Sequence, residues 1–84
     1  MELKEKFETA VQESEGLNTK PSNEDLLKLY AFYKQATIGD NCMEPPGGFD
    51  FKAAAKYNAW MAIKGKGHED AMAGYIDLIE SLKP

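Results

Sequence analysis

The sequence predicts an all-α fold, a four-helix bundle around one core. Four segments place apolar residues three, four and seven positions apart, a spacing that gathers them on one face of a helix. No segment alternates apolar and polar residues with period two, and the β-branched residues are scattered along the chain. With 84 residues the chain can bury roughly 60–65% of its unfolded surface, so we expect a single domain over residues 1–84.

The first two helices are predicted over residues 2–15 and from Ser22 to about Ile38. Proline disfavours helix at the residue before it, so the segment that ends in Pro21 links them. Ser22 is a favourable N-cap because its hydroxyl can accept a bond from an amide of the first turn, and the acidic residues that follow suit the helix dipole. Gly39 is expected to take the left-handed conformation that commonly ends a helix.

Residues 40–49 form the one long irregular segment, since two prolines and two glycines exclude regular structure there. At about ten residues the loop is longer than the median connection. It can therefore cross the bundle and let the next helix run in a direction that a tight turn would forbid. A third helix is predicted over residues 51–64, with Asp50 as its N-cap and Gly65 after its end. A fourth follows over residues 67–82, with the cleanest apolar stripe in the chain.

The net charge of −4 argues against a general binder of nucleic acid or of anionic membranes, since such proteins usually carry a basic excess. All ten basic residues are lysines, and the chain has no arginine. Bidentate recognition of a phosphate or a carboxylate is therefore excluded, and any anion must be held by point charges. We expect an anion site to be local, built from a few lysines on an otherwise acidic protein.

The residue types that commonly carry catalysis or bind metals are too few or too poorly placed here. Cys42 is the single cysteine, so an internal disulfide is excluded, and nothing links it to His68, the single histidine. One cysteine and one histidine do not make a zinc site. The carboxylates fall at helix ends or on polar faces, where capping and solubility account for them. We therefore expect neither an enzyme nor a metal site.

The sequence predicts no secretory signal peptide and no membrane span. The N-terminal residues 1–7 are charged and lack the apolar core of a signal peptide. No apolar run approaches the ~18–20 residues that a membrane-spanning helix needs. We expect a soluble, cytoplasmic protein.

The second helix carries a stripe of aromatic and basic residues that points to a ligand. Tyr30, Tyr33 and Lys34 share this stripe, which lies about a quarter-turn from the apolar one. Two flat rings beside a cation suit a ligand that is part ring and part anion. On the third helix, Lys52 and Lys56 share a face, but their spacing leaves open whether they approach Lys34 or form ordinary solvated surface.

Tyr75 lies among the apolar residues of the fourth helix, so it either packs in the core or reaches a ligand with its hydroxyl. The residues alone thus predict a helical binding protein for a molecule that is both aromatic and anionic. A module that receives a partner's amphipathic helix in an aromatic, apolar groove is the alternative.

Residues 30–40 resemble the acyl-CoA-binding protein family, in the motif Tyr-x-x-Tyr-Lys-Gln-Ala-Thr-x-Gly-Asp. The resemblance continues through Pro46-Gly, Asp50-Phe and the run at 56–60, and it covers essentially the whole chain. It implies a four-helix bundle of up-down-down-up topology, in which residues 39–49 form a long overhand loop between the second and third helices. It also implies non-covalent, non-catalytic binding of long-chain acyl-CoA without a cofactor, and therefore buffering and intracellular transport of that ligand.

The resemblance also implies roles for single residues. The 3′-phosphate of the CoA head group would be held by Tyr30, Lys34 and Lys56. The adenine would pack along Tyr33, and the rim would be completed by Lys52 and Tyr75. The acyl chain would be sheltered by Leu26 and Leu27. Such a protein is expected to be a monomer that makes transient contacts with acyl-CoA-using enzymes or membranes.

Two positions depart from the family pattern near the expected ligand site. Glu15 stands where the family often has a lysine that helps with the phosphates. An acid there would repel an anion, so we expect that the contact is lost or that the side chain points away. Tyr57 replaces the usual tryptophan beside Lys56, which keeps an aromatic ring but a smaller one.

Overall fold

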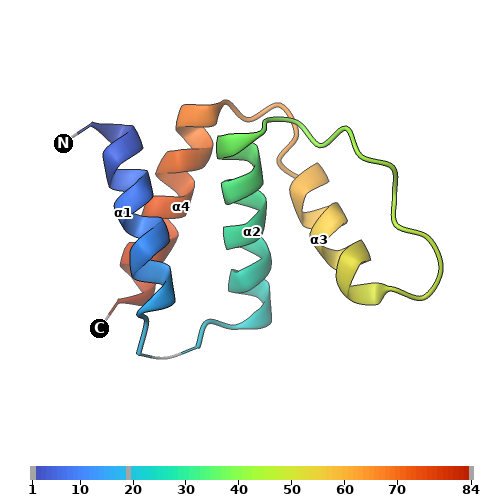
Figure 1. Ribbon diagram of the computed structural model, residues 1–84, viewed down its shortest axis with the longest axis horizontal. Helices are drawn as coiled ribbons and strands as arrows, with labels where there is room; N and C mark the ends of the chain where they lie inside the picture. Colours follow the sequence, from blue (N-terminus) through green and yellow to red (C-terminus); the bar gives the residue numbers. More distant parts are fainter. Residues whose placement is uncertain (1, 19, 84) are drawn as a thin grey trace.

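The computed structural model describes residues 2–18 and 20–83, in which it forms four α-helices and no strand (Figure 1). They are α1 Leu3–Glu15, α2 Asn23–Thr37, α3 Phe51–Met61 and α4 His68–Leu82. The predicted all-α, four-helix fold class is confirmed. None of the described helices is both long and apolar enough to cross a membrane.

The arrangement of the helices places α3 at the flank of the molecule. In Figure 1, α1 and α4 run in one direction while α2 and α3 run in the other, which is the predicted up-down-down-up order. α2 packs against both α4 and α3, and α1 packs against α4. Among the described helices, α2 alone packs on α3. Because α2 and α3 are parallel, the segment between them travels back along the outer side of α3 before that helix begins.

The core lies where α1, α2 and α4 meet. Its buried members come from all three helices and are Phe7, Ala10, Leu29, Ala36, Ala71, Tyr75 and Ile79. From the predicted apolar stripe of α2, Leu29 and Ala36 are buried and Phe32 packs against them. α2 and α4 approach closely at Gly74, where a Cβ atom would lie only 2.7 Å from Cε1 of Phe32. A glycine at this position therefore lets the Phe32 ring pack directly on the α4 backbone.

The predicted helix caps are formed. The Ser22 hydroxyl accepts a hydrogen bond from the amide of Asp25 at 3.1 Å. The Asp50 carboxylate accepts one from the amide of Ala53 at 3.0 Å. Gly39 has a φ of 107°, the left-handed conformation expected after α2. These local signals fix where α2 and α3 begin and where α2 ends.

The end of the third helix was predicted wrongly, since α3 stops at Met61 rather than at Lys64. The amides of Ile63 and Lys64 bond to carbonyls three residues back, at 3.2 and 3.1 Å, so the chain tightens there instead of continuing the α-helix. The physical reason lies outside the helix. The amide of Gly65 donates to the carboxylate of Asp40 at 2.7 Å, which draws this turn toward the end of α2.

A buried side-chain network holds α3 against α2. Gln35 is 1% exposed, and its Nε2 donates to Oδ1 of Asp40 at 2.9 Å and to the carbonyl of Lys66 at 2.8 Å. Its Oε1 accepts from Nε1 of Trp60 at 3.1 Å, and the same indole N–H also lies 2.9 Å from the Gly39 carbonyl. One amide side chain thereby ties together α2, the start of the long loop, α3 and the turn before α4.

The same network lowers the pKa of the Asp40 carboxyl below its usual value of 3.8. The hydrogen bond from the Gly65 amide is the largest cause, the bond from Gln35 is the next, and the charge of Lys64 adds to them, while burial acts in the opposite direction. In the sequence, Gln35 and Asp40 stand out only as members of the family motif. The structure shows that their role is to position α3.

Candidate ligand-binding site

The principal candidate site is a groove between α2 and α3 with a volume of about 620 Å³. Its walls come from the first half of each helix, and they are formed by Asn23, Leu26, Leu27, Tyr30, Lys52, Ala55 and Lys56. Most of these residues were predicted to bind a ligand. Leucines and an alanine line it together with the stems of two lysines, so the groove suits an apolar chain attached to a charged group.

Two lysine ammonium groups converge on the ring of Tyr30. Nζ of Lys34, on α2, lies 5.7 Å from the ring centre, and Nζ of Lys56, on α3, lies 5.4 Å from it. Of the two lysines whose approach spacing left open, Lys56 lies beside the same ring as Lys34, whereas Lys52 lines the groove. Within the described residues neither ammonium forms a salt bridge; those that do belong to Lys28 and Lys83.

This cluster favours an anion. Two like charges beside one phenol repel each other unless an anion lies between them, and a compact, multiply charged group such as a phosphate can accept bonds from both. The Lys34 ammonium also lies 5.8 Å from the ring centre of Trp60, whose ring meets that of Tyr30 edge to face at 6.5 Å. The aromatic rings therefore attract the cations and support their position beside Tyr30.

A smaller cavity of about 260 Å³ adjoins the groove, since Leu26 and Tyr30 line both. Tyr33 and Tyr75 line this cavity from α2 and α4. Tyr33 is 40% exposed, whereas Tyr75 is 5% exposed and is a member of the core. Tyr75 therefore packs in the core, as the first interpretation expected, and it also lines the cavity; contact of its hydroxyl with a ligand stays a prediction.

The ring of Phe7, on α1, supports these two tyrosines from behind. Its centre lies 6.1 Å from that of Tyr33 in a stacked arrangement and 5.2 Å from that of Tyr75 in an edge-to-face arrangement. The tyrosine rings themselves are 6.5 Å apart. Tyr33 thus presents an exposed, rigidly backed ring to solvent, which is suited to stacking on a flat ligand.

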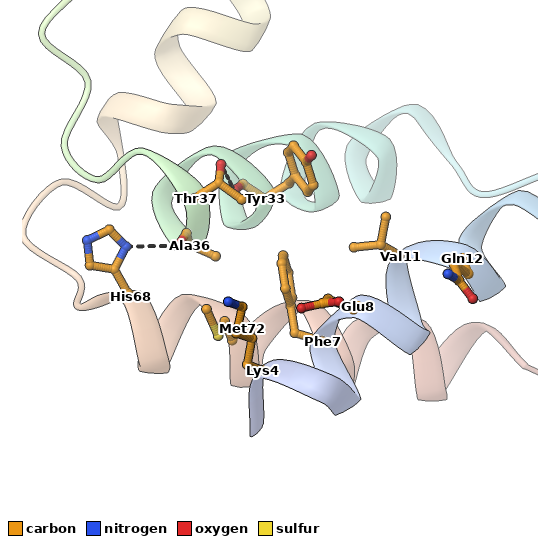
Figure 2. A pocket seen from close by; sticks show the side chains of 10 residues that line it. All are labelled: Lys4, Phe7, Glu8, Val11, Gln12, Tyr33, Ala36, Thr37, His68 and Met72. Carbon is orange, nitrogen blue, oxygen red and sulfur yellow. Dashed lines mark hydrogen bonds between the residues drawn. The ribbon is translucent and has the colours of Figure 1, made fainter. Parts of the chain in front are cut away.

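A third hollow, of about 660 Å³, lies on the other side of Tyr33 and is shown in Figure 2. It runs between α1 and the ends of α2 and α4, with Lys4 and His68 toward one end and Gln12 toward the other. Of the predicted ligand-binding residues it includes Tyr33 alone. Nδ1 of His68 lies 2.8 Å from the carbonyl of Ala36, so this ring is engaged with the end of α2.

The loop supplies residues that the sequence analysis did not assign to the site. A cavity of about 220 Å³ behind Tyr30 and Lys56 is walled partly by Asn41 and Met43 of the loop, and Tyr57 and Trp60 of α3 also line it. Asn41 is buried, and its Oδ1 accepts from the amide of Met43 at 2.9 Å. The predicted loop thus lines a cavity that shares Tyr30 and Lys56 with the groove. The aromatic ring retained at Tyr57 lines the same cavity.

Glu15 is exposed at the end of α1 and lines neither the groove nor the adjoining cavity. Whether the phosphate contact is lost or the side chain points away from the anion stays a prediction. Cys42 is also exposed, and its thiol contacts the carbonyl of Asp40 at 3.6 Å, while His68 is engaged with Ala36. The two residues thus have separate backbone partners.

A protein-family model described as "Acyl CoA binding protein" matches residues 4–79. The chain belongs to the acyl-CoA-binding protein family. Within the family it is 50% identical over 76 residues to the acyl-CoA-binding protein of Saccharomyces cerevisiae, a match that covers 90% of this chain and 87% of the yeast protein. It is 47% identical over 76 residues to acyl-CoA-binding protein homolog 1 of Caenorhabditis elegans, which covers 90% of this chain and 88% of that protein.

The fold agrees with solved structures of the same family. The crystal structure of acyl-CoA-binding protein 2 from Oryza sativa superimposes with a TM-score of 0.91 at 43% sequence identity. The superposition covers 96% of this chain and 90% of the rice chain. The family resemblance that the motif at residues 30–40 indicated is therefore confirmed from sequence and from structure.

Proposed function

We propose that this protein binds long-chain fatty acyl-CoA thioesters non-covalently, buffers their free concentration and carries them between the sites where they are made and used. Family membership supports the ligand class. The observation that carries the proposal to this chain is the pair of ammonium groups, from Lys34 and Lys56, that flank the Tyr30 ring at one end of an apolar groove. A long-chain acyl-CoA thioester joins an anionic nucleotide, which suits the two ammonium groups, to an acyl chain, which suits the apolar groove.

The head group is proposed to bind at the cation cluster. Lys34 and Lys56 contribute two charges and the Tyr30 hydroxyl contributes a hydrogen bond to the 3′-phosphate, which has enough oxygens to satisfy all three. The adenine stacks on the exposed ring of Tyr33, which Phe7 supports from behind. Lys52 and Tyr75 complete the rim, Lys52 from the groove and Tyr75 from the adjoining cavity.

The acyl chain is proposed to lie in the α2–α3 groove against Leu26, Leu27 and Ala55. Each buried methylene contributes roughly 0.8 kcal/mol, offset in part by the ordering of the chain. A chain with about a dozen buried methylenes can therefore contribute several kcal/mol in addition to the head group's hydrogen bonds. Affinity should rise steadily with chain length until the groove is full.

The protein is proposed to act as a non-catalytic, cytoplasmic monomer without a cofactor, which transfers its ligand during transient contacts with acyl-CoA-using enzymes or membranes. A groove for a partner's helix is not favoured as an alternative. Such a groove would need an apolar stripe along its length, whereas this one ends in two ammonium groups around a phenol.

Isothermal titration with palmitoyl-CoA, free CoA and palmitate in parallel tests the proposal. We expect tight binding of palmitoyl-CoA, weaker binding of CoA and negligible binding of palmitate, because only the thioester occupies the cation cluster and the groove together. If palmitoyl-CoA bound no better than palmitate, the cation cluster would have no role in recognition and the proposal would be wrong. Turnover of palmitoyl-CoA by the pure protein would contradict the non-catalytic part.

A further inference from the structure

The α2–α3 groove is shorter than the long acyl chain that it is proposed to hold. Its α2 wall runs from Tyr30 back to Asn23, and seven positions of helix at about 1.5 Å each make about 10 Å. A fully extended chain gains about 1.2 Å per bond, one third of the span of an extended residue, so a palmitoyl chain is about 18 Å long. About 8 Å of that chain therefore extends beyond the groove walls.

The excess chain is expected to leave the groove at the end where α2 and α3 begin. The ammonium groups proposed to hold the head group, those of Lys34 and Lys56, lie around Tyr30 at the other end. Asn23 and Lys52 line the groove in the first turns of the two helices, which begin at the same end of the molecule in Figure 1. An acyl chain that follows the groove away from the ammonium groups therefore runs toward these first turns.

The most exposed large apolar side chains in the described part of the molecule lie at this end, where the long loop enters α3. Phe49 is 90% exposed and Phe51 is 78% exposed. We call these two residues the aromatic tip. Phe51 stands one helical turn before Ala55, which lines the groove, so the two share a face of α3. Two phenyl rings in water are unfavourable, and such exposed apolar groups mark binding surfaces.

The surroundings of the aromatic tip leave room for an apolar chain. Asp50 stands between the two phenylalanines, but its carboxylate accepts a hydrogen bond from the amide of Ala53 and is thus directed to the start of α3. Gly47 and Gly48 precede the aromatic tip, and a Cβ atom on either would meet nothing within 4 Å. The backbone before Phe49 is therefore not packed against other elements, and a small shift of the loop can bring its ring toward the groove.

From these observations we propose that the aromatic tip covers the part of a long acyl chain that extends beyond the groove, and thereby determines which chain lengths the protein binds most tightly. This inference rests on the proposed function. An octanoyl chain ends within the groove and does not reach the aromatic tip, whereas a palmitoyl chain does. Each methylene that the aromatic tip covers should raise the affinity by roughly fourfold at most.

Isothermal titration with octanoyl-CoA, dodecanoyl-CoA and palmitoyl-CoA tests the proposal. We compare the wild type with the double variant Phe49→Ser, Phe51→Ser, and with the double variant Phe49→Leu, Phe51→Leu, which keeps an apolar surface. The matched control is Ile38→Ser, which removes an apolar side chain that is 60% exposed at the opposite end of α2. Far-UV circular dichroism checks that each variant keeps its helices.

We expect the serine double variant to bind octanoyl-CoA as the wild type does and to bind palmitoyl-CoA about tenfold or more weakly. The leucine double variant and Ile38→Ser should follow the wild type at every chain length. Unchanged affinity of the serine variant for palmitoyl-CoA would overturn the proposal. Equal losses for octanoyl-CoA and palmitoyl-CoA would also overturn it, because the aromatic tip would then support the fold of the site rather than the end of the chain.

Nuclear magnetic resonance of the wild type provides a test that needs no substitution. The amide and ring signals of Phe49 and Phe51 should shift when palmitoyl-CoA binds and stay in place when octanoyl-CoA binds. Signals that respond equally to both ligands, or to neither, would contradict the proposal. Self-association of the ligand-free wild type that the serine variant abolishes and palmitoyl-CoA leaves unchanged would assign the aromatic tip to a second copy of the chain instead.

The two proposals fail separately. A wild type that binds palmitoyl-CoA, with the same dependence on chain length in the serine variant, refutes the role of the aromatic tip alone. A wild type that shows no affinity for any of the three thioesters refutes the carrier function.

Discussion

The ammonium groups of Lys34 and Lys56 lie on opposite helices of the groove and within 5.7 and 5.4 Å of the centre of the same ring, that of Tyr30. Their meeting depends on how α3 lies on α2, since none of the other described helices packs on α3. The anion site is therefore a property of the α2–α3 junction. Substitutions that shift α3 relative to α2 should therefore weaken ligand binding, even when the substituted residue does not contact the ligand.

Gln35→Ala should loosen the α2–α3 junction and lower both stability and affinity. The substitution leaves the buried indole N–H of Trp60 with one acceptor fewer and deprives Asp40 of a donor. We expect the free energy of unfolding in urea to fall by about 1–3 kcal/mol. Titration with palmitoyl-CoA should show weaker binding. Gln12→Ala, on the exposed face of α1, is the matched control and should change neither quantity; a Gln35→Ala protein as stable as wild type would contradict the role of the network.

Gly74→Ala should destabilise the protein although alanine is the better helix former. The new Cβ would lie 2.7 Å from Cε1 of Phe32, so the ring must move out of its packed position. Overpacking of this kind costs about 1–3 kcal/mol, against which helix propensity returns about 1 kcal/mol. Gly47→Ala is the control, because a Cβ there meets nothing within 4 Å and its backbone is not in the left-handed conformation. Thermal unfolding of both variants would decide, and a gain in stability at position 74 would disprove the close approach of α2 and α4.

Ala55→Phe should fill the α2–α3 groove and change ligand preference rather than remove binding. The large ring competes for the space assigned to the acyl chain, while the cation cluster stays in place. We expect a greater loss of affinity for palmitoyl-CoA than for a short-chain thioester such as butyryl-CoA. Asn58→Phe, at an exposed position of the same helix, controls for the added aromatic ring. Equal losses for both thioesters would show that the acyl chain lies elsewhere.

Asp40 should make the protein less stable in acid. Its folded-state pKa is lowered below 3.8 by the bond from the Gly65 amide and then by Gln35 and Lys64. A carboxyl group whose pKa is lower in the folded state stabilises that state above the unfolded pKa, and the contribution disappears as pH falls through the folded pKa. Urea midpoints of wild type and Asp40→Asn should therefore differ most near neutral pH and converge below 3.8. A difference that stays constant across this range would contradict a titrating Asp40.

Local features of the sequence were sufficient to predict the helical class and most helix ends. Ser22, Asp50 and Gly39 act through hydrogen bonds or backbone conformations within a few residues, so their roles are readable from sequence alone. The residue at which α3 ends could not be predicted from local sequence features. It depends on the bond between Gly65 and Asp40, which are 25 positions apart.

The candidate site was predicted in its residue types but not in its assembly. The phenols and the ammonium of α2 follow from helical spacing, whereas the approach of Lys56 to Tyr30 depends on the packing of α3, which no local pattern encodes. Tyr75 was left between two roles because a side chain at a helix interface can serve the core and a cavity at once.

The most direct test of the account is a comparison of palmitoyl-CoA with 3′-dephospho-palmitoyl-CoA on the wild type, Lys34→Ala and Lys56→Ala. Lys28→Ala is the control, since this exposed lysine of α2 pairs with Glu24 and lines no part of the groove. Each of the two cluster variants should lose about 1.5–3 kcal/mol of affinity for palmitoyl-CoA, about tenfold or more, and little for the dephospho analogue. Equal losses for both ligands would contradict the assignment of the 3′-phosphate to the ammonium groups around Tyr30.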